Sequence, residues 1–124
     1  MGEPTTVIAI VDDESVVRRG IISLLKSLGF AAIDFASAEE FLSSGRAKDI
    51  SCVITDVWMP GMSGIDLLHQ LIAAGHKVPV IIMTAFPDES IRTRAIKAGA
   101  VGLLTKPFDQ NTLLDCVNSA LHRS

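Results

Sequence analysis

The sequence predicts an α/β fold in which a doubly wound, five-stranded parallel sheet is built from five strand–helix units. Two observations predict this fold. Short apolar runs rich in β-branched residues alternate along the chain with segments whose apolar residues recur at helical spacing. The connections between these segments are short, so right-handed crossovers bring each strand back parallel to its predecessor. With 124 residues and 48% apolar content, we expect one domain covering residues 1–124.

Apolar runs mark the strands. The five predicted strands are Val7–Val11, Ala32–Phe35, Ser51–Thr55, Val78–Thr84 and Ala100–Thr105. The first is continuously apolar, which is typical of an interior strand of a parallel sheet, and the third is expected to be a second interior strand. Asp34 interrupts the second strand and favours a position at the sheet edge. Pro79 is tolerable because it stands near the start of its strand.

Helical periodicity and capping signals mark the segments between the strands. The residues whose helical spacing marks an inward face are Val17, Gly20, Ile21, Leu24, Leu25 and Leu28, then Ile65, Leu68, Leu71 and Ile72, then Ile91, Ala95, Ile96 and Ala98, and finally Leu113, Leu114, Val117, Ala120 and Leu121. Gly29 and Gly99 end the first and fourth helices. Ser37 and Glu40 have the spacing of a capping box and start a short second helix. The expected caps of the other helices are Ser63, Asp88 and Asp109.

Composition excludes several classes of function. The net charge is −3 and the eleven Lys and Arg residues are scattered, so the chain has no electrostatic footprint for nucleic acid. No apolar stretch is long enough to span a membrane, and the N-terminal sequence MGEPTT is not a signal peptide. Cys52 and Cys116 have no metal-binding spacing, so we expect two buried, reduced thiols and a cytoplasmic protein.

Polar residues follow four of the predicted strands at the point where each strand ends. Asp12 and Asp13 follow the first strand, Asp56 the third, Thr84 ends the fourth and Lys106 follows the fifth. The carboxyl ends of parallel strands share one edge of the sheet, so we expect these side chains to meet there. Taken singly, each has a plainer explanation. Asp13 could simply cap the first helix, and Asp56 could be a turn-forming residue. Thr84 could merely end its strand, and Lys106 could be a solvated lysine.

Three carboxylates at one edge of a sheet create a charge problem. Each pair repels by roughly 4 kcal/mol at about 4 Å and an effective dielectric near 20. A divalent cation would remove this repulsion, and oxygen ligands with few protein carboxylates suit Mg²⁺, with Mn²⁺ as a possible replacement. Lys106 adds a point charge and Thr84 a hydroxyl donor for phosphate oxygens. The arrangement therefore indicates a phosphoryl site in which a carboxylate could be the nucleophile.

Four motifs in this order are similar to a known family. The segments IVDDE, VITDVWMPGMSG, VIIMTA and LLTKPF resemble the receiver domain of two-component response regulators, the CheY-like superfamily, along the whole chain. MPGMSGIDLL and KPF look most like the FixJ-type subgroup. The resemblance implies a flavodoxin-like (βα)5 fold with strand order 2-1-3-4-5. It also implies that the chain could be the N-terminal part of a longer, transcriptional regulator.

The resemblance implies a role for each residue at the sheet edge. Asp56 would accept the phosphoryl group and would bind Mg²⁺ together with Asp13 and the backbone carbonyl of Trp58, while Asp12 would act mainly through a metal-bound water. Thr84 and Lys106 would hold the phosphoryl oxygens. Ala85 would leave room for the phosphoryl group, and the Lys106–Pro107 bond would be cis.

The resemblance also implies a signalling mechanism. A sensor histidine kinase or a phosphotransfer protein would supply the phosphoryl group. Phosphorylation would shift the face formed by the fourth helix, the fifth strand and the fifth helix, which could also form a homodimer. DNA would be bound only by an output domain absent from this chain, and no membrane contact is expected. The chain would catalyse only its own phosphorylation and dephosphorylation, so it is not classed as a turnover enzyme.

One apolar position departs from the usual pattern of the family, and two others bear on the rate of dephosphorylation. The family usually has Tyr or Phe three residues before the lysine as a rotameric switch, whereas this chain has Leu103, so the aromatic description of the output step cannot be transferred. Trp58 and Phe86 occupy positions that tune phosphoryl hydrolysis in the family. Because both are large, we expect them to hinder the attacking water, although Trp58 could equally be a simple cover for its loop.

Three other functions fit the same residues less well. A pseudo-receiver that only binds partners is disfavoured by the complete set of polar residues, and Leu103 keeps it open. A phosphatase with an aspartate nucleophile normally needs a general acid two residues further on, where this chain has Trp58. No G-x-G-x-x-G follows the first strand, which argues against a dinucleotide enzyme.

Overall fold

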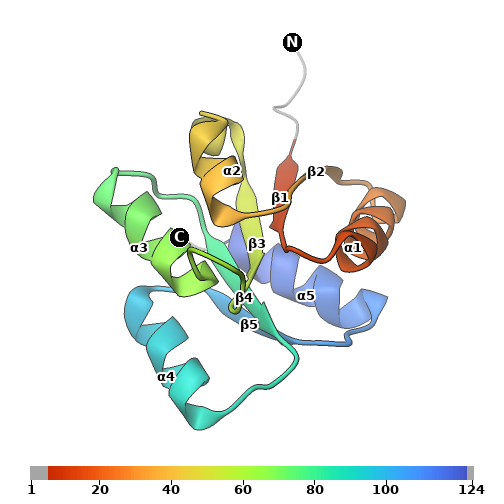
Figure 1. Cartoon of the computed structure of the whole chain (residues 1–124). Helices are drawn as coiled ribbons and strands as arrows, with labels where there is room; N and C mark the ends of the chain where they lie inside the picture. Colours follow the sequence, from red (N-terminus) through yellow and green to blue (C-terminus); the bar gives the residue numbers. More distant parts are fainter. Residues whose placement is uncertain (1–5, 123–124) are drawn as a thin grey trace.

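The computed structural model describes residues 6–122 and contains one sheet of five parallel strands in the order β2-β1-β3-β4-β5 (Figure 1). The strands are β1 (Val7–Val11), β2 (Ala31–Phe35), β3 (Cys52–Asp56), β4 (Val80–Thr84) and β5 (Gly102–Thr105). The strand order and the flavodoxin-like fold agree with the sequence prediction, and β2 lies at an edge as expected. The segment of residues 1–5, most of the stretch judged not to be a signal peptide, lies outside the described residues.

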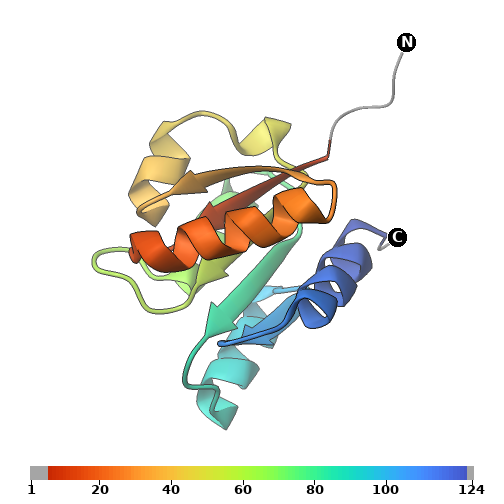
Figure 2. The same ribbon diagram turned by 90° about the vertical axis from the view of Figure 1, so that its right-hand side faces the viewer.

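Helices cover both faces of the sheet. They are α1 (Ser15–Ser27), α2 (Ala38–Ser43), α3 (Gly64–Ala73), α4 (Glu89–Ala98) and α5 (Gln110–Leu121), with a short 3-10 turn at Ala47–Asp49. Helices α1 and α5 lie on one face and α2, α3 and α4 on the other (Figure 2). No helix of the described chain is long and apolar enough to cross a bilayer.

Side chains of the strands alternate between two apolar cores. In β4, Val80 and Ile82 join the core beneath α2, α3 and α4, whereas Ile81 and Met83 join the core beneath α1 and α5. This alternation explains why the interior strands are apolar over most of their length, since both of their faces are buried. All five residues of β3 and of β4 are buried, so the polar residues at their ends are anchored by rigid elements.

Helix ends follow the expected chemistry with one exception. Gly29, which follows the C-cap residue of α1, and Gly99, the C-cap residue of α4, have positive φ angles of 93° and 104°, as their roles as stop signals require. Ser63 and Asp66 form a complete capping box at α3. At α2, Ser37 accepts from the Glu40 N–H, but the Glu40 carboxylate accepts from Ala36 and not from Ser37. The predicted capping box at α2 is therefore only half formed.

Several predicted details are wrong. Strand β4 starts at Val80 and not at Val78, because Pro79 has no N–H for the ladder. Strand β5 starts at Gly102 and β3 runs one residue later than expected. Three helical residues predicted to face inward are exposed, namely Gly20, Ile72 by 54% and Ile96 by 66%. For the two isoleucines the preceding residue, Leu71 or Ala95, is buried, and a step of about 100° turns its neighbour toward solvent.

The two cysteines are free, and only one of them is fully buried. Cys52 lies in β3, where burial raises its pKa to about 12 and nearby Cys116 adds to the rise. Cys116 is partly exposed on α5, which corrects the expectation of two buried thiols. Its sulfur packs against Gly102, where a Cβ atom would lie 2.8 Å from Sγ. Cys52 and Cys116 therefore both help to pack α5 against the sheet.

Candidate functional site

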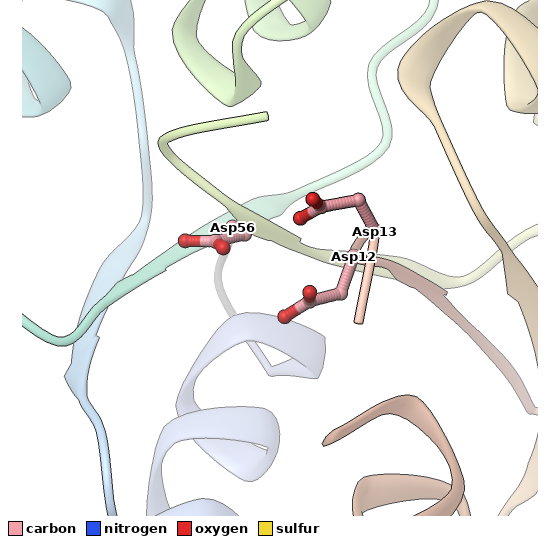
Figure 3. Close-up of side chains that lie close together, drawn as sticks. All are labelled: Asp12, Asp13 and Asp56. Carbon is pink, nitrogen blue, oxygen red and sulfur yellow. The ribbon is translucent and has the colours of Figure 1, made fainter. Parts of the chain in front are cut away.

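Three carboxylates meet at the carboxyl edge of the sheet. Asp12 and Asp13 follow β1, Asp56 ends β3, and one oxygen of each lies within 4.8 Å of the others. Figure 3 shows the three side chains converging from these two neighbouring strands. Asp12 and Asp56 are buried whereas Asp13 is exposed, so the group opens to solvent on one side. Hard oxygen ligands at this separation fit a small divalent cation such as Mg²⁺.

Lys106 joins two of these acids. Its Nζ donates to Asp12 Oδ2 at 2.8 Å and to Asp56 Oδ2 at 3.3 Å, and its side chain is only 14% exposed. The backbone N–H of Lys106 donates to the Thr84 carbonyl at 2.8 Å, which ties the end of β5 to the end of β4. The bond between Lys106 and Pro107 is cis. The interpretation of Lys106 as a solvated lysine is therefore wrong.

The polar atoms of Asp12 are all hydrogen-bonded to other protein groups. Its Oδ1 accepts from the Glu14 N–H at 2.9 Å, its Oδ2 from Lys106, and its own N–H donates to the Phe35 carbonyl at 3.2 Å. Asp13 does not cap α1, because Glu14 occupies the N-cap position. The plainer explanation of Asp13 as a helix cap is therefore contradicted.

Opposing effects set the ionisation of the site. Burial raises the pKa of Asp56 above its ordinary value, Lys106 opposes the rise, and the negative charge of Asp12 adds to it. Burial also acts to lower the pKa of Lys106, but the combined hydrogen bonds and charges of Asp12 and Asp56 outweigh burial and raise it. Since one lysine faces two acids, the local charge favours an additional cation.

Helix α3 approaches Asp56 closely. The N–H of Gly64 donates to the Val57 carbonyl at 3.0 Å, and a Cβ atom at Gly64 would collide with the backbone carbonyl oxygen of Asp56. The hydroxyl of buried Thr55 donates to this same carbonyl at 3.1 Å. The main chain of Asp56 is therefore held from two sides, and only glycine fits at position 64.

The remaining predicted residues lie in β4 and β5 or in the loops that follow β3 and β4. Thr84 is 1% exposed, and its hydroxyl accepts from the Phe86 N–H at 3.1 Å. Ala85 is exposed, as are Trp58 by 54% and Phe86 by 78%. Leu103 pairs with Ile82 of β4 and packs, partly buried, against the core beneath α2, α3 and α4.

Two contacts near the acids were not predicted from the sequence. Arg18 of α1 donates from Nη1 to the Asp12 carbonyl at 2.7 Å and from Nε to Asp34 Oδ2 of β2 at 2.9 Å. Glu39 of α2 accepts at 3.0 Å from the N–H of Met62, in the loop that follows Asp56. Both contacts join residues distant in sequence, and the only signal was the charged Asp34 within an otherwise apolar strand.

Comparison with known proteins agrees with this geometry. Residues 8–118 match the family model described as the response regulator receiver domain. The transcriptional regulatory protein FixJ of Azorhizobium caulinodans is 41% identical over 115 residues, which cover 93% of this chain and 54% of that protein. The response regulator protein TodT of Pseudomonas putida is 39% identical over 121 residues, 98% of this chain and 53% of its own length. The chain thus spans about half the length of these curated relatives.

Solved structures give the same result. The crystal structure named FixJ-N is 35% identical, has a TM-score of 0.87, and covers 100% of this chain with 98% of its own. The chemotaxis protein CheY4 of Vibrio cholerae, at 24% identity and a TM-score of 0.87 over 94% of this chain and 99% of its own, is similar in fold. From its sequence, its strand order and the acidic edge of its sheet, the chain belongs to the receiver domain family of two-component response regulators.

Proposed function

We propose that this chain is a phosphoacceptor domain in which Asp56 receives a phosphoryl group from a sensor histidine kinase or a phosphotransfer protein. The observation that carries the proposal is the position of Lys106, whose Nζ lies between Asp12 and Asp56. Lys106 offsets one of the three negative charges and leaves the other two unbalanced. A site of this kind suits a cation and a doubly charged phosphoryl group together.

Mg²⁺, or Mn²⁺ in its place, would be held by Asp13, Asp56 and the backbone carbonyl of Trp58, with Asp12 acting through water. When bound, the cation would neutralise charge on the transferring phosphoryl oxygens. The closeness of the three acidic side chains supports this ligand set. Asp13 is the best available direct ligand, because it is exposed while Asp12 is engaged by Lys106 and Glu14.

The residues of the chain then have distinct roles in the transfer. A carboxylate oxygen of Asp56 attacks phosphorus, the P–N bond to the donor histidine breaks, and its electron pair returns to the imidazole. Lys106 donates to a phosphoryl oxygen, which stabilises the charge developing there. The hydroxyl of Thr84 already accepts from Phe86, so its proton is free to be donated to a second phosphoryl oxygen. Ala85 leaves the space that the group needs.

The output step would use the face formed by α4, β5 and α5. A shift of Thr84 and Lys106 toward the phosphoryl group would bias this face between two states. Leu103 lies on β5 diagonally across from Thr84 and beneath α4, so it could follow the shift in place of an aromatic switch. The same face could form a homodimer.

The relatives named as transcriptional regulators support a role in transcription. In that role residues 1–124 act as one receiver domain, and DNA is bound by an output domain that these residues do not include. Free Cys52 and Cys116 support a cytoplasmic location. The chain changes only itself, by gaining and losing its own phosphoryl group, so it is a switch and not a turnover enzyme.

Two exposed aromatic residues would set the lifetime of the phosphoryl group. Trp58 stands two residues after Asp56 and Phe86 two residues after Thr84, and their side chains are 54% and 78% exposed. Such large apolar side chains hinder the approach of a water molecule in line with the Asp56–phosphorus bond. We therefore include slow loss of the phosphoryl group in the proposal.

The test is phosphorylation by a small phosphodonor. We expect phosphoramidate and Mg²⁺ to add one phosphoryl group by intact mass, and we expect no adduct in Asp56→Asn or when Mg²⁺ is chelated. Lys106→Met should still bind Mg²⁺ but react slowly, because the charge on the phosphoryl oxygens is no longer compensated. An unmodified wild-type protein would instead favour the pseudo-receiver, a partner-binding module that is never phosphorylated.

A further inference from the structure

Arg18 lies outside the acidic group but contacts the peptide unit from which Asp13 projects. Its side chain is 16% exposed, and its guanidinium joins an acceptor in the residue after β1 to an acceptor on β2. Nη1 donates to the Asp12 carbonyl at 2.7 Å, and Nε donates to Asp34 Oδ2 on the edge strand β2 at 2.9 Å. Nothing in the proposed transfer uses this arginine.

The contacted carbonyl belongs to the peptide unit that links Asp12 to Asp13. Its orientation therefore sets the direction in which the Cα–Cβ bond of Asp13 leaves the chain. The other polar atoms of Asp12 are fixed by Phe35, Glu14 and Lys106. Within residues 6–122, no hydrogen bond to the Asp13 carboxylate is present, so its place near Asp56 depends on the main chain alone.

We propose that Arg18 is a positioning residue, which uses the fork between Asp34 and the Asp12 carbonyl to hold Asp13 ready to bind a divalent cation. This inference rests on the proposed function, since it concerns the metal that the acids would hold. Asp34 orients the guanidinium, and the guanidinium orients the peptide. The edge strand, which contributes no ligand itself, thereby controls the geometry of the site.

A plain electrostatic role makes the opposite prediction. A positive charge near three carboxylates repels a cation, so removal of the Arg18 charge alone should tighten Mg²⁺ binding. Removal of a positioning contact should weaken it. The sign of the change in affinity therefore separates the two roles.

The test is a Mg²⁺ titration of the whole chain, followed by the fluorescence of Trp58, which is the only tryptophan and stands two residues after Asp56. We expect Arg18→Ala to raise the dissociation constant about tenfold, as is typical when a partner behind a metal ligand is removed. Arg18→Lys keeps the charge but cannot hold both acceptors, so we expect it to weaken binding as well. Arg19→Ala is the matched control, because Arg19 is the next residue of α1, is exposed, and carries the same charge. Its dissociation constant should stay within about twofold of wild type, because an exposed charge is largely screened.

Phosphorylation gives a second readout. With phosphoramidate, Arg18→Ala should need more Mg²⁺ for half-maximal rate but should reach a rate near that of wild type at saturating Mg²⁺. A residue that only stabilised the fold would lower the free energy of unfolding and leave the Mg²⁺ requirement unchanged. Urea unfolding without Mg²⁺ measures this contribution separately.

Arg18→Lys is the fallback if Arg18→Ala does not fold. Because lysine keeps the positive charge, a loss of Mg²⁺ affinity in this variant comes from the lost contacts to Asp34 and the Asp12 carbonyl and not from electrostatics. Unchanged or tighter Mg²⁺ binding in Arg18→Ala, or in Arg18→Lys if only that variant folds, would overturn the inference. Failure of the proposed function has a different signature, because the wild-type protein itself would then neither bind Mg²⁺ nor accept a phosphoryl group.

Discussion

Replacement of Gly64 by alanine tests how tightly α3 is packed against the phosphoacceptor strand. Gly64 is the first residue of α3 and is buried. A Cβ atom there would collide with the carbonyl oxygen of Asp56 and would lie 3.1 Å from both the carbonyl carbon of Asp56 and the Cγ2 of Thr55. Gly64 is not among the glycines with positive φ, so the requirement for glycine comes from space and not from backbone conformation.

The size of the effect follows from what the new methyl group meets. Overpacking usually costs about 1–3 kcal/mol, with the lower values where a flexible side chain can rotate away. Here the obstacle is the main chain of β3, whose five residues are all buried and whose last carbonyl also accepts from Thr55. We therefore expect Gly64→Ala to lower the free energy of unfolding by about 3 kcal/mol, a large share of the roughly 5–15 kcal/mol typical of a whole domain.

The assay is urea unfolding followed by circular dichroism, with Gly20→Ala as the matched control. Gly20 lies within α1, and a Cβ atom there would meet nothing within 4 Å. Because alanine is the better helix former, the control should gain about 0.5–1 kcal/mol. Two identical substitutions should thus change stability in opposite directions. If Gly64→Ala lost less than about 1 kcal/mol, the reasoning from close packing would be refuted.

Two further predictions concern the phosphoacceptor and its neighbours. Burial raises the pKa of Asp56; the charge of Lys106 opposes this rise and the charge of Asp12 adds to it. The folded state therefore binds the proton of Asp56 more tightly than the unfolded state does. The contribution of Asp56 to stability consequently falls as the pH rises through its folded pKa. We expect Asp56→Asn to be more stable than wild type at neutral pH without Mg²⁺, and to lose less stability between acid and neutral pH; equal urea midpoints at neutral pH would contradict this. Trp58→Asn and Phe86→Glu should each lose the phosphoryl group faster than wild type in a decay measured by intact mass, and unchanged or slower decay in both would remove these residues from the proposed control of lifetime.

The order of the elements could be predicted because each depends on a local pattern. Buried strands such as β1 are apolar at every position, and the stop signals Gly29 and Gly99 need no knowledge of distant contacts. The meeting of Asp12, Asp13 and Asp56 followed from topology alone, because parallel strands place their carboxyl ends at one edge. The starts of β3, β4 and β5 could not be predicted in this way, since a strand begins where its neighbour offers hydrogen bonds.

Other features depend on contacts that no local pattern contains. Periodicity predicts that Ile72 and Ile96 belong to the core, because an apolar residue next to a buried one fits a broad helical face. Both are exposed, because the way α3 and α4 pack on the sheet turns these positions toward solvent. The fork of Arg18 joins α1, β1 and β2, and the bond of Glu39 to Met62 joins α2 to the loop after β3. A charged residue on a surface helix usually remains solvated, so no pattern in the sequence predicts that these groups pair.

The hydrogen bonds of the acidic edge divide its residues into two groups. Buried Asp12 and Thr84 have their polar atoms bonded to protein groups, and within residues 6–122 no buried side-chain nitrogen or oxygen lacks a partner. Asp13 is exposed and receives no such bond within that part of the chain. A buried polar group without a partner would cost about 1–3 kcal/mol, so the fold can leave a carboxylate unbonded only where solvent or a ligand reaches it. Asp13 therefore marks the side from which a cation would enter. The hydrogen-bonded residues Asp12 and Thr84 form the fixed frame that the cation would meet.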